Sequence, residues 1–110
     1  MDITKEIHIS KEKLLFVKEA VKNLEDLNKL LAKAVSEDTT SLLESILLSC
    51  NLLEASDLHF EPEENSIKLR IRVDGILHDV FVFDQQTYKT LLSRIKLVSE
   101  IKLNISDKAQ

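Results

Sequence analysis

The stretch Ser56–His78, SDLHFEPEENSIKLRIRVDGILH, decides the fold of this chain. Apolar and polar residues alternate in DLHFEP at 57–62 and in SIKLRIRV at 66–73, which is the period of a strand with one buried face and one wet face. Asp74 and Gly75 follow, and Asp-Gly favours a two-residue type I′ hairpin because both positions need a positive φ. The second strand and the apolar run after Gly75 are therefore predicted to be antiparallel neighbours.

The residues on either side of this stretch are predicted to be helical. From Lys11 to Val35 apolar residues recur at steps of three and four, with Ser10 as the N-cap, so we expect one helix of about 37 Å at about 1.5 Å per residue. After the polar break SEDTT, SLLESILLSCNLLEA predicts a second helix in which Ser41 and Glu44 have capping-box spacing. A third helix is expected from Asp84 onward. Its apolar stripe would be Tyr88, Leu91, Leu92, Ile95, Val98 and Ile101.

Together these elements predict an α/β fold of the α+β type. It consists of two N-terminal helices, a small, mainly antiparallel three-stranded sheet, and a C-terminal helix packed on the apolar face of the sheet. Because the polar break separates the first helix from the rest, residues 1–40 are expected to form a helical arm and residues 41–110 the domain proper.

Composition restricts the class of partner. Fifteen Lys and Arg against nineteen Asp and Glu give a net charge of −4, which disfavours nonspecific binding to nucleic acid, so any anion site must be local. The single cysteine, Cys50, cannot form an internal disulfide and lies in a leucine-rich run, as expected for a buried residue in a reducing cytosol. No stretch approaches the roughly 18 apolar residues of a membrane span, so we expect a cytoplasmic protein without direct membrane insertion.

Three cationic residues, Lys68, Arg70 and Arg72, fall on one face of the second strand, about 6.6 Å apart from one to the next. Two interpretations stay open. The first is a solvated strand face whose cations pair with nearby glutamates. Those glutamates are Glu61, Glu63 and Glu64. The second is a phosphate site, because a planar guanidinium binds phosphate through two parallel hydrogen bonds.

A metal site is conceivable where Asp57, His59 and Glu61 share a strand face, with His78 across the sheet. Three residues along one strand span too far to close around an ion unaided. We therefore predict no metal site and expect these side chains to hold the start of the strand by hydrogen bonds.

The sequence offers no catalytic motif. Gly75 is the only glycine and no G-x-x-x-x-G-K-[ST] motif occurs, so the chain alone is not expected to bind a nucleoside triphosphate in the P-loop manner. Ser56 and Ser93 have no evident base partner, and no G-x-S-x-G pattern occurs. The chain by itself is predicted not to be an enzyme.

Three segments in order, LLEASDLHFEP, LRIRVDGILHDV and LLSRIKLVSEIKLNI, resemble the motor ATPases of type II secretion and type IV pilus systems. The resemblance covers about Ser41 to Gln110. It implies the second N-terminal domain of these ATPases, which in that family lies immediately before the P-loop ATPase domain. It also implies that the chain is a fragment of a longer ATPase, because the family pattern continues past the segment at Gln110. Residues 1–40 match no part of that pattern.

The resemblance implies roles for three arginines. Arg70 and Arg72 occupy the arginine positions of the family's Arg-x-Arg-[hydrophobic]-Asp-Gly segment, and Arg94 occupies that of its Ser-Arg-[Ile/Val]-Lys segment. In the hexameric family, arginines of this domain reach the nucleotide held by a neighbouring ATPase domain. All three are therefore expected to bind nucleotide. Some members carry a further arginine after the third strand, where this chain has DQQ at 84–86, and that contact is expected to be missing.

The implied function is that of a non-catalytic domain that supplies arginines toward the nucleotide and supports ring assembly. The full-length parent would be a homohexameric ATPase that uses ATP and magnesium. The fragment alone is expected to bind no cofactor. Expected partners are the ATPase domain of the same or a neighbouring subunit and proteins of the secretion or pilus apparatus, through which it would lie at the inner membrane. The alternative is an adaptor module that docks a partner through its first helix, with the arginines on a solvated face.

Overall fold

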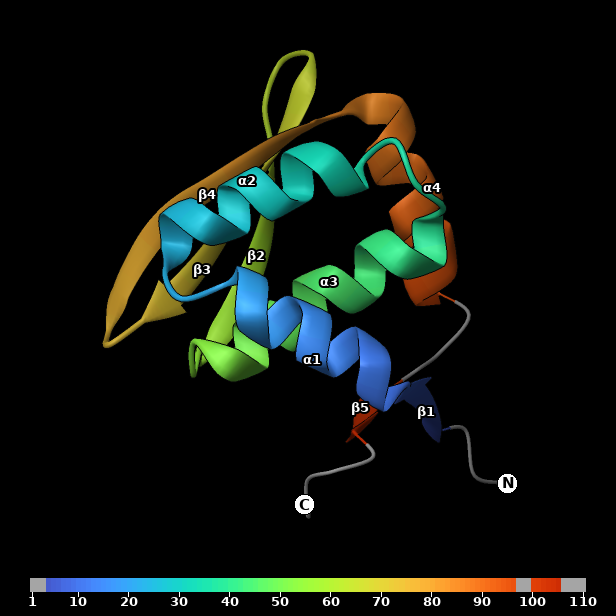
Figure 1. Ribbon diagram of the computed structural model, residues 1–110. Helices are drawn as coiled ribbons and strands as arrows, with labels where there is room; N and C mark the ends of the chain where they lie inside the picture. The colour runs from blue at the N-terminus through green and yellow to red at the C-terminus, as the bar shows by residue number, and fades with distance from the viewer. Residues whose placement is uncertain (1–3, 97–99, 106–110) are drawn as a thin grey trace.

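The computed structural model describes residues 4–96 and 100–105 of the chain, with side chains for residues 9–94. Two small sheets and four helices follow one another along it (Figure 1). In chain order they are β1 (Thr4–Ile9), α1 (Lys11–Ala20), α2 (Leu24–Ala34), α3 (Thr39–Leu52), β2 (Asp57–Pro62), β3 (Ser66–Val73), β4 (Ile76–Asp84), α4 (Gln85–Lys96) and β5 (Glu100–Ile105).

The three-stranded sheet is the one that the sequence predicts. Its order is β2-β3-β4, and both neighbouring pairs are antiparallel. The hairpin between β3 and β4 turns at Asp74 and Gly75, whose φ angles of 53° and 79° are the positive values that a type I′ turn needs. The α+β class and the strand boundaries from Asp57 to Val73 are confirmed.

The prediction of one continuous helix from Lys11 to Val35 is wrong. The chain leaves the helix at Val21, which has an extended backbone, and starts a new one after Asn23. Asn23 caps α2 by accepting a hydrogen bond from the backbone N–H of Asp26 at 2.8 Å. The Asp26 carboxylate in turn accepts from the backbone N–H of Lys22 at 3.0 Å. The apolar period survives the break because both helices turn their apolar side toward one core.

Two further helix boundaries differ from expectation. Helix α3 begins at Thr39, and its N-cap is Asp38, which accepts from the backbone N–H of Ser41 at 2.8 Å. Ser41 is therefore inside the helix and not its cap. Helix α4 is capped by Asp84 as predicted, through a 2.7 Å hydrogen bond from the Thr87 N–H, but ends at Lys96. Ile101 belongs to β5 instead, and Val98 lies outside the described residues.

A second sheet was not predicted. Strands β1 and β5 pair in parallel, from Thr4 opposite Glu100 to Ile9 opposite Ile105. The two strands lie side by side near the start of α1, apart from the three-stranded sheet (Figure 1). This pairing joins segments close to the two ends of the chain, which local sequence signals do not reveal.

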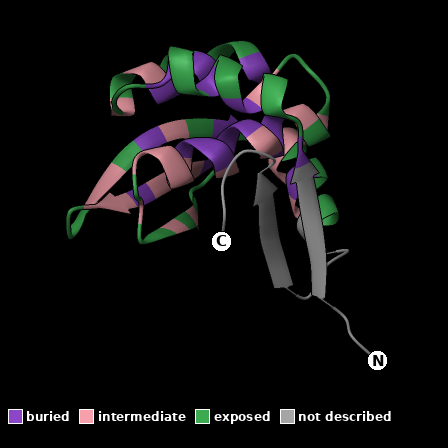
Figure 2. Cartoon of the chain, turned by 60° about the horizontal axis from the view of Figure 1, so that its bottom comes forward, coloured by how far each residue is buried: buried purple, intermediate pink, exposed green. Residues whose placement is uncertain are grey.

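The hydrophobic core lies between the helices and the apolar face of β2-β3-β4, where buried residues gather (Figure 2). Val17 of α1, Leu31 of α2, Leu48 of α3, Leu69 of β3 and Leu91 of α4 are all fully buried members of this one cluster. Residues on both sides of position 40 thus contribute to one core. The division into two domains at residue 40 stays a prediction. No helix among the described residues has the length and apolar character to cross a membrane.

A β-bulge interrupts the pairing of β3 with β4. Leu69 lies opposite Phe81 and Arg70 opposite Asp79, so Val80 has no register partner on β3. The side chain of Val80 is buried, and its carbonyl accepts a 2.6 Å hydrogen bond from the Asn28 side chain of α2. The extra residue puts the β4 side chains before and after Val80 out of phase, so Asp79 lies on the solvent face beside Arg70 while Phe81 lies on the core face opposite Leu69.

The two faces of the sheet should respond differently to truncation. We expect Leu69→Ala to lower the free energy of unfolding by about 2–5 kcal/mol, because Leu69 is fully buried and a cavity would remain. The control, Val82→Ala on β4, removes a side chain that is 52% exposed and should cost less than about 1 kcal/mol. Urea unfolding of both variants measures the difference. Equal losses would mean that the sheet is not buried on the side described.

Candidate functional site

The solvent side of β2-β3-β4 forms a charged face in which acidic strands flank a basic one. The pairing register places the acidic residues of β2 on one side of the β3 cations and Asp79 of β4 on the other side. Its members are Asp57, His59 and Glu61 on β2, Lys68, Arg70 and Arg72 on β3, and Asp79 on β4. The structure therefore brings Arg70 and Arg72 together as predicted, on the face opposite the core.

Arg70 is held by two carboxylates. Its Nε donates to Asp79 Oδ1 at 2.8 Å, and its Nη1 donates to Glu61 Oε2 at 3.1 Å. The hydrogen bond to Glu61 is the largest of the effects that raise the pKa of Arg70. These contacts fix the direction of the guanidinium, which lies over the sheet between its two acidic neighbours.

Lys68 and Asp79 extend this network. Lys68 Nζ lies 3.3 Å from Glu63 Oε2 and 3.3 Å from Asp79 Oδ2, so Asp79 is shared between a lysine and an arginine. The hydrogen bond to Glu63, and then that to Asp79, raises the pKa of Lys68. The hydrogen bond from Lys68, with the charges of Lys68 and Arg70, lowers the pKa of Asp79. Asp79 was not predicted as a site residue.

Arg72 is held more loosely than Arg70. Its Nε lies 3.4 Å from Asp57 Oδ2, and its Nη1 donates to the Gly75 carbonyl at 3.3 Å. Asp57 also shares a 2.8 Å hydrogen bond with Nε2 of His59. Both Arg72 contacts lie beyond the usual 2.7–2.9 Å of a charge-assisted hydrogen bond, so this guanidinium can be redirected with less loss.

The Asp57, His59 and Glu61 set does not assemble as ligands of an ion. Asp57 and His59 bond to each other, and Glu61 bonds to Arg70. No group of three or more metal-binding side chains occurs among residues whose placement the structure describes. His78 lies opposite Ile71, on the helix-covered face, so the idea that it faces His59 across the sheet is wrong.

Arg94 is not brought to the charged face. It is exposed on α4, the helix that covers the other side of the sheet, where Tyr88 packs on Phe60 with ring centroids 5.4 Å apart. There Arg94 lines a hollow of about 300 Å³ together with Thr39 of α3. Its predicted role in nucleotide binding would therefore need a contact separate from that of Arg70 and Arg72.

Cys50 fits the expectation of a structural residue. The thiol lies in α3 against the core, and desolvation by burial raises its pKa to about 11. At neutral pH it stays protonated, which makes it a poor nucleophile and a poor metal ligand.

Comparison with known proteins identifies the family of this chain. The family described as "Type II/IV secretion system protein" matches residues 32–109, which is more than half of the chain and starts within α2. The Type IV pilus assembly ATPase PilB of Acinetobacter baylyi is 39% identical over 66 residues, covering 60% of this chain and 11% of that protein. The Type II secretion system ATPase E of Vibrio cholerae is 39% identical over 54 residues, covering 49% of this chain and 10% of that protein.

A longer match, at lower identity, is with the Type IV pilus assembly ATPase PilB of Myxococcus xanthus. It is 27% identical over 88 residues, covering 79% of this chain and 15% of that protein. The chain thus spans between 10% and 15% of the length of these three curated relatives. No solved structure gives a significant match.

The charged face predicts a specific dependence of stability on pH. Because the pKa of Asp79 is lowered below its ordinary 3.8 in the folded chain, its contribution to stability is complete above that value and is lost as pH falls below it. Asp79→Asn should therefore flatten the acid side of the stability profile, measured by urea unfolding from pH 6 to pH 2. Glu64→Gln is the control, since no ion pair among the described residues involves its carboxylate. Identical acid slopes in the parent and Asp79→Asn would contradict the assigned network.

Proposed function

Because the chain belongs to the type II/IV secretion system protein family, we propose that it is a non-catalytic N-terminal domain of a secretion or pilus motor ATPase. In this proposal Arg70 and Arg72 contact the triphosphate of a nucleotide bound by an ATPase domain, and the domain supports assembly of the ring. The observation that carries it is the position of both arginines on the solvent face of one strand, away from the core.

The geometry of β3 supports this role. Alternate residues of one strand point to the same side, so the two guanidinium groups rise from a fixed backbone about 6.6 Å apart. Leu69 and Ile71 between them are fully buried, which holds that backbone against the core. A charged group on such a support loses little freedom when it binds phosphate, and guanidinium matches phosphate oxygens through paired N–H donors.

The carboxylates around Arg70 are compatible with this role but set a condition on it. A guanidinium has five N–H donors, and Asp79 and Glu61 accept from two of them. A triphosphate approaching the charged face would have to share or replace these partners. Arg72, with its longer contacts, would exchange its partners more easily.

ATP and magnesium belong to the proposed longer protein. The nucleotide would supply the phosphoryl group, and magnesium would neutralise part of its charge. The contribution of this chain would be to place arginine charge near the transferring phosphoryl group, where a well-positioned arginine can strongly accelerate turnover. Arg94 is retained as a proposed contact to a different part of the nucleotide or to a neighbouring subunit.

The assembly is also proposed by analogy with the matched relatives, which carry the names of pilus assembly and secretion ATPases. The domain would contact the ATPase domain of its own or a neighbouring subunit in a homohexamer. Proteins of the secretion or pilus apparatus would hold that ring at the inner membrane from the cytoplasmic side. No contact with nucleic acid is proposed, since the net charge of −4 disfavours it.

The test uses a full-length motor ATPase carrying this domain. Arg70→Ala and Arg72→Ala should each leave the hexamer intact and shift the melting temperature by less than about 4 °C, because both side chains lie on the solvent face, where ion pairs contribute little to stability. Both should lose most ATP turnover at saturating nucleotide, up to about 10³-fold for an arginine that acts on the phosphoryl group. A coupled ATPase assay, thermal unfolding and light scattering provide the three readouts.

Lys68→Ala is the matched control for both arginine variants. It removes a cation from the same strand and the same face, but an ammonium lacks the planar fork that binds two phosphate oxygens. We expect it to retain turnover within about twofold of the parent. If both arginine variants turn over ATP like the parent, the charged face is a solvated surface and the proposed nucleotide contact is excluded.

A further inference from the structure

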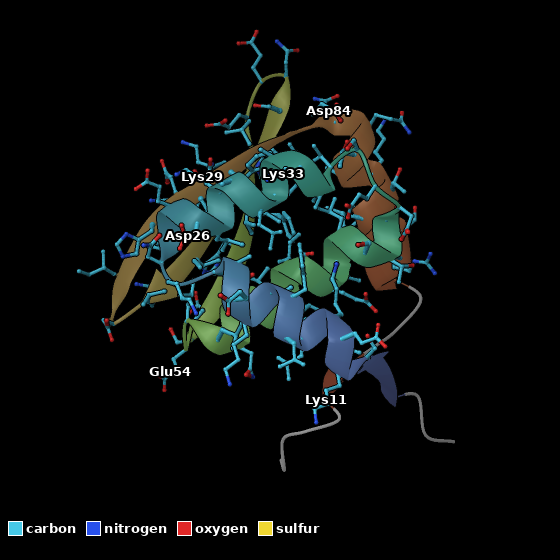
Figure 3. The ribbon with its side chains drawn as sticks, viewed as in Figure 1. Lys11, Asp26, Lys29, Lys33, Glu54 and Asp84 are labelled. Atoms are coloured by element: carbon cyan, nitrogen blue, oxygen red, sulfur yellow. The ribbon has the colours of Figure 1, made fainter. Side chains whose placement is uncertain are left out.

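A hollow lies between α1 and α2, on the helical side of the molecule. None of its lining residues belongs to the charged face. The hollow encloses about 260 Å³, and we call it the α1–α2 hollow. Its lining residues are Phe16 and Ala20 of α1 and Asp26, Lys29, Leu30 and Lys33 of α2. The four α2 residues recur at i, i+3, i+4 and i+7, so one wall is a single stripe about 10 Å long at about 1.5 Å per residue. Figure 3 labels Asp26, Lys29 and Lys33, which follow one another along α2.

The apolar part of this surface is left exposed by the described residues. Helix α1 turns Leu14 and Val17 into the core, yet Phe16 is 59% exposed. Phe16 and Ala20 are one turn apart and form the α1 wall of the hollow, with Leu30 at its base from α2. Phenylalanine at this level of exposure beside an apolar floor is typical of a surface that a partner covers.

The charge around the hollow is unbalanced toward the positive. The Asp26 carboxylate accepts a hydrogen bond from the Lys22 backbone N–H at 3.0 Å, just before the start of α2. Lys29 lies 3.8 Å from Glu25 with both side chains at least 70% exposed, which is a weak pair. Lys33 has no ion pair with any of the residues that the structure describes, and it stands one turn beyond Lys29. Two lysines thus border the apolar floor against one carboxylate, Asp26, so the lining residues carry a net charge of +1.

We propose that the α1–α2 hollow binds an amphipathic helical segment of a partner protein. The segment places one large apolar side chain against Phe16 and Leu30 and a carboxylate, one turn away, against Lys29 and Lys33. A helix laid in a groove presents side chains at the same i, i+3 and i+4 spacing as the α2 wall, so the two stripes are compatible in pitch. The proposal is independent of the nucleotide contact on the opposite face.

A displayed library of random 14-residue peptides with helix-favouring flanks, selected on the intact chain, tests this. The enriched peptides should carry a large apolar residue with Asp or Glu three or four positions away. Phe16→Ala and Lys33→Glu in the chain should each weaken their binding about tenfold or more. Replacing the peptide acid with Lys should abolish binding to the parent chain and restore it to Lys33→Glu. Circular dichroism checks that each variant is folded.

Leu15→Ala is the matched control, since Leu15 is the neighbour of Phe16 on α1, is 50% exposed and does not line the hollow. It should leave peptide affinity within about twofold of the parent. Failure to enrich any peptide, enrichment of basic peptides, or equal binding to the parent and to Phe16→Ala would each overturn the proposal. So would a concentration-dependent dimer of the chain that Phe16→Ala abolishes, because the occupant would then be a second copy.

Discussion

The alternation of β3 is the constraint on which the rest of this structure depends. As the central strand of three, β3 pairs on both edges, and its Leu69 and Ile71 are fully buried beneath the helices. Lys68, Arg70 and Arg72 must then face solvent. A slip of one residue would bury three cations and expose the core side chains, so burial fixes the register and the register fixes the charged face.

The bulge at Val80 connects this core to the electrostatics of the outer face. Without it, Asp79 would join Phe81 and Phe83 on the apolar side of β4, where an unpaired carboxylate is costly. With it, Asp79 lies beside Arg70 and Lys68, and the Val80 carbonyl is satisfied by Asn28 of α2. A hydrogen bond from a helix on one side of the sheet thus supports the position of a carboxylate on the other.

The elements with strong local signals could be predicted from the sequence. The β3 alternation and the Asp74-Gly75 turn decide the hairpin, and Asp84 marks the start of α4. The break at Val21 escaped prediction because the apolar period continues through it, although Asn23 and Asp26 already have the spacing of a helix cap. The parallel pair β1 and β5 could not be found from local patterns, since its strands are separated by almost the whole chain.

For the site, the residues that share β3 could be predicted, whereas their partners across the sheet could not. Asp79 was missed because the bulge is needed to place it, although its phase with Phe81 and Phe83 in the sequence is the signal of that bulge. Arg94 was grouped with Arg70 and Arg72 only through the family resemblance, and its helix covers the opposite side of the sheet. Tertiary packing, and not motif order, decides which charges meet.

The central claim is that burial of one face of β3 presents Arg70 and Arg72 to a bound nucleotide. An experimental structure of a full-length motor carrying this domain, with a non-hydrolysable ATP analogue and magnesium, tests it most directly. The account predicts guanidinium nitrogens of Arg70 or Arg72 about 2.7–2.9 Å from phosphate oxygens, with the contacts to Glu61, Asp79 or Asp57 shared or released. Both arginines still held only by those carboxylates, with no phosphate oxygen in reach, would contradict it.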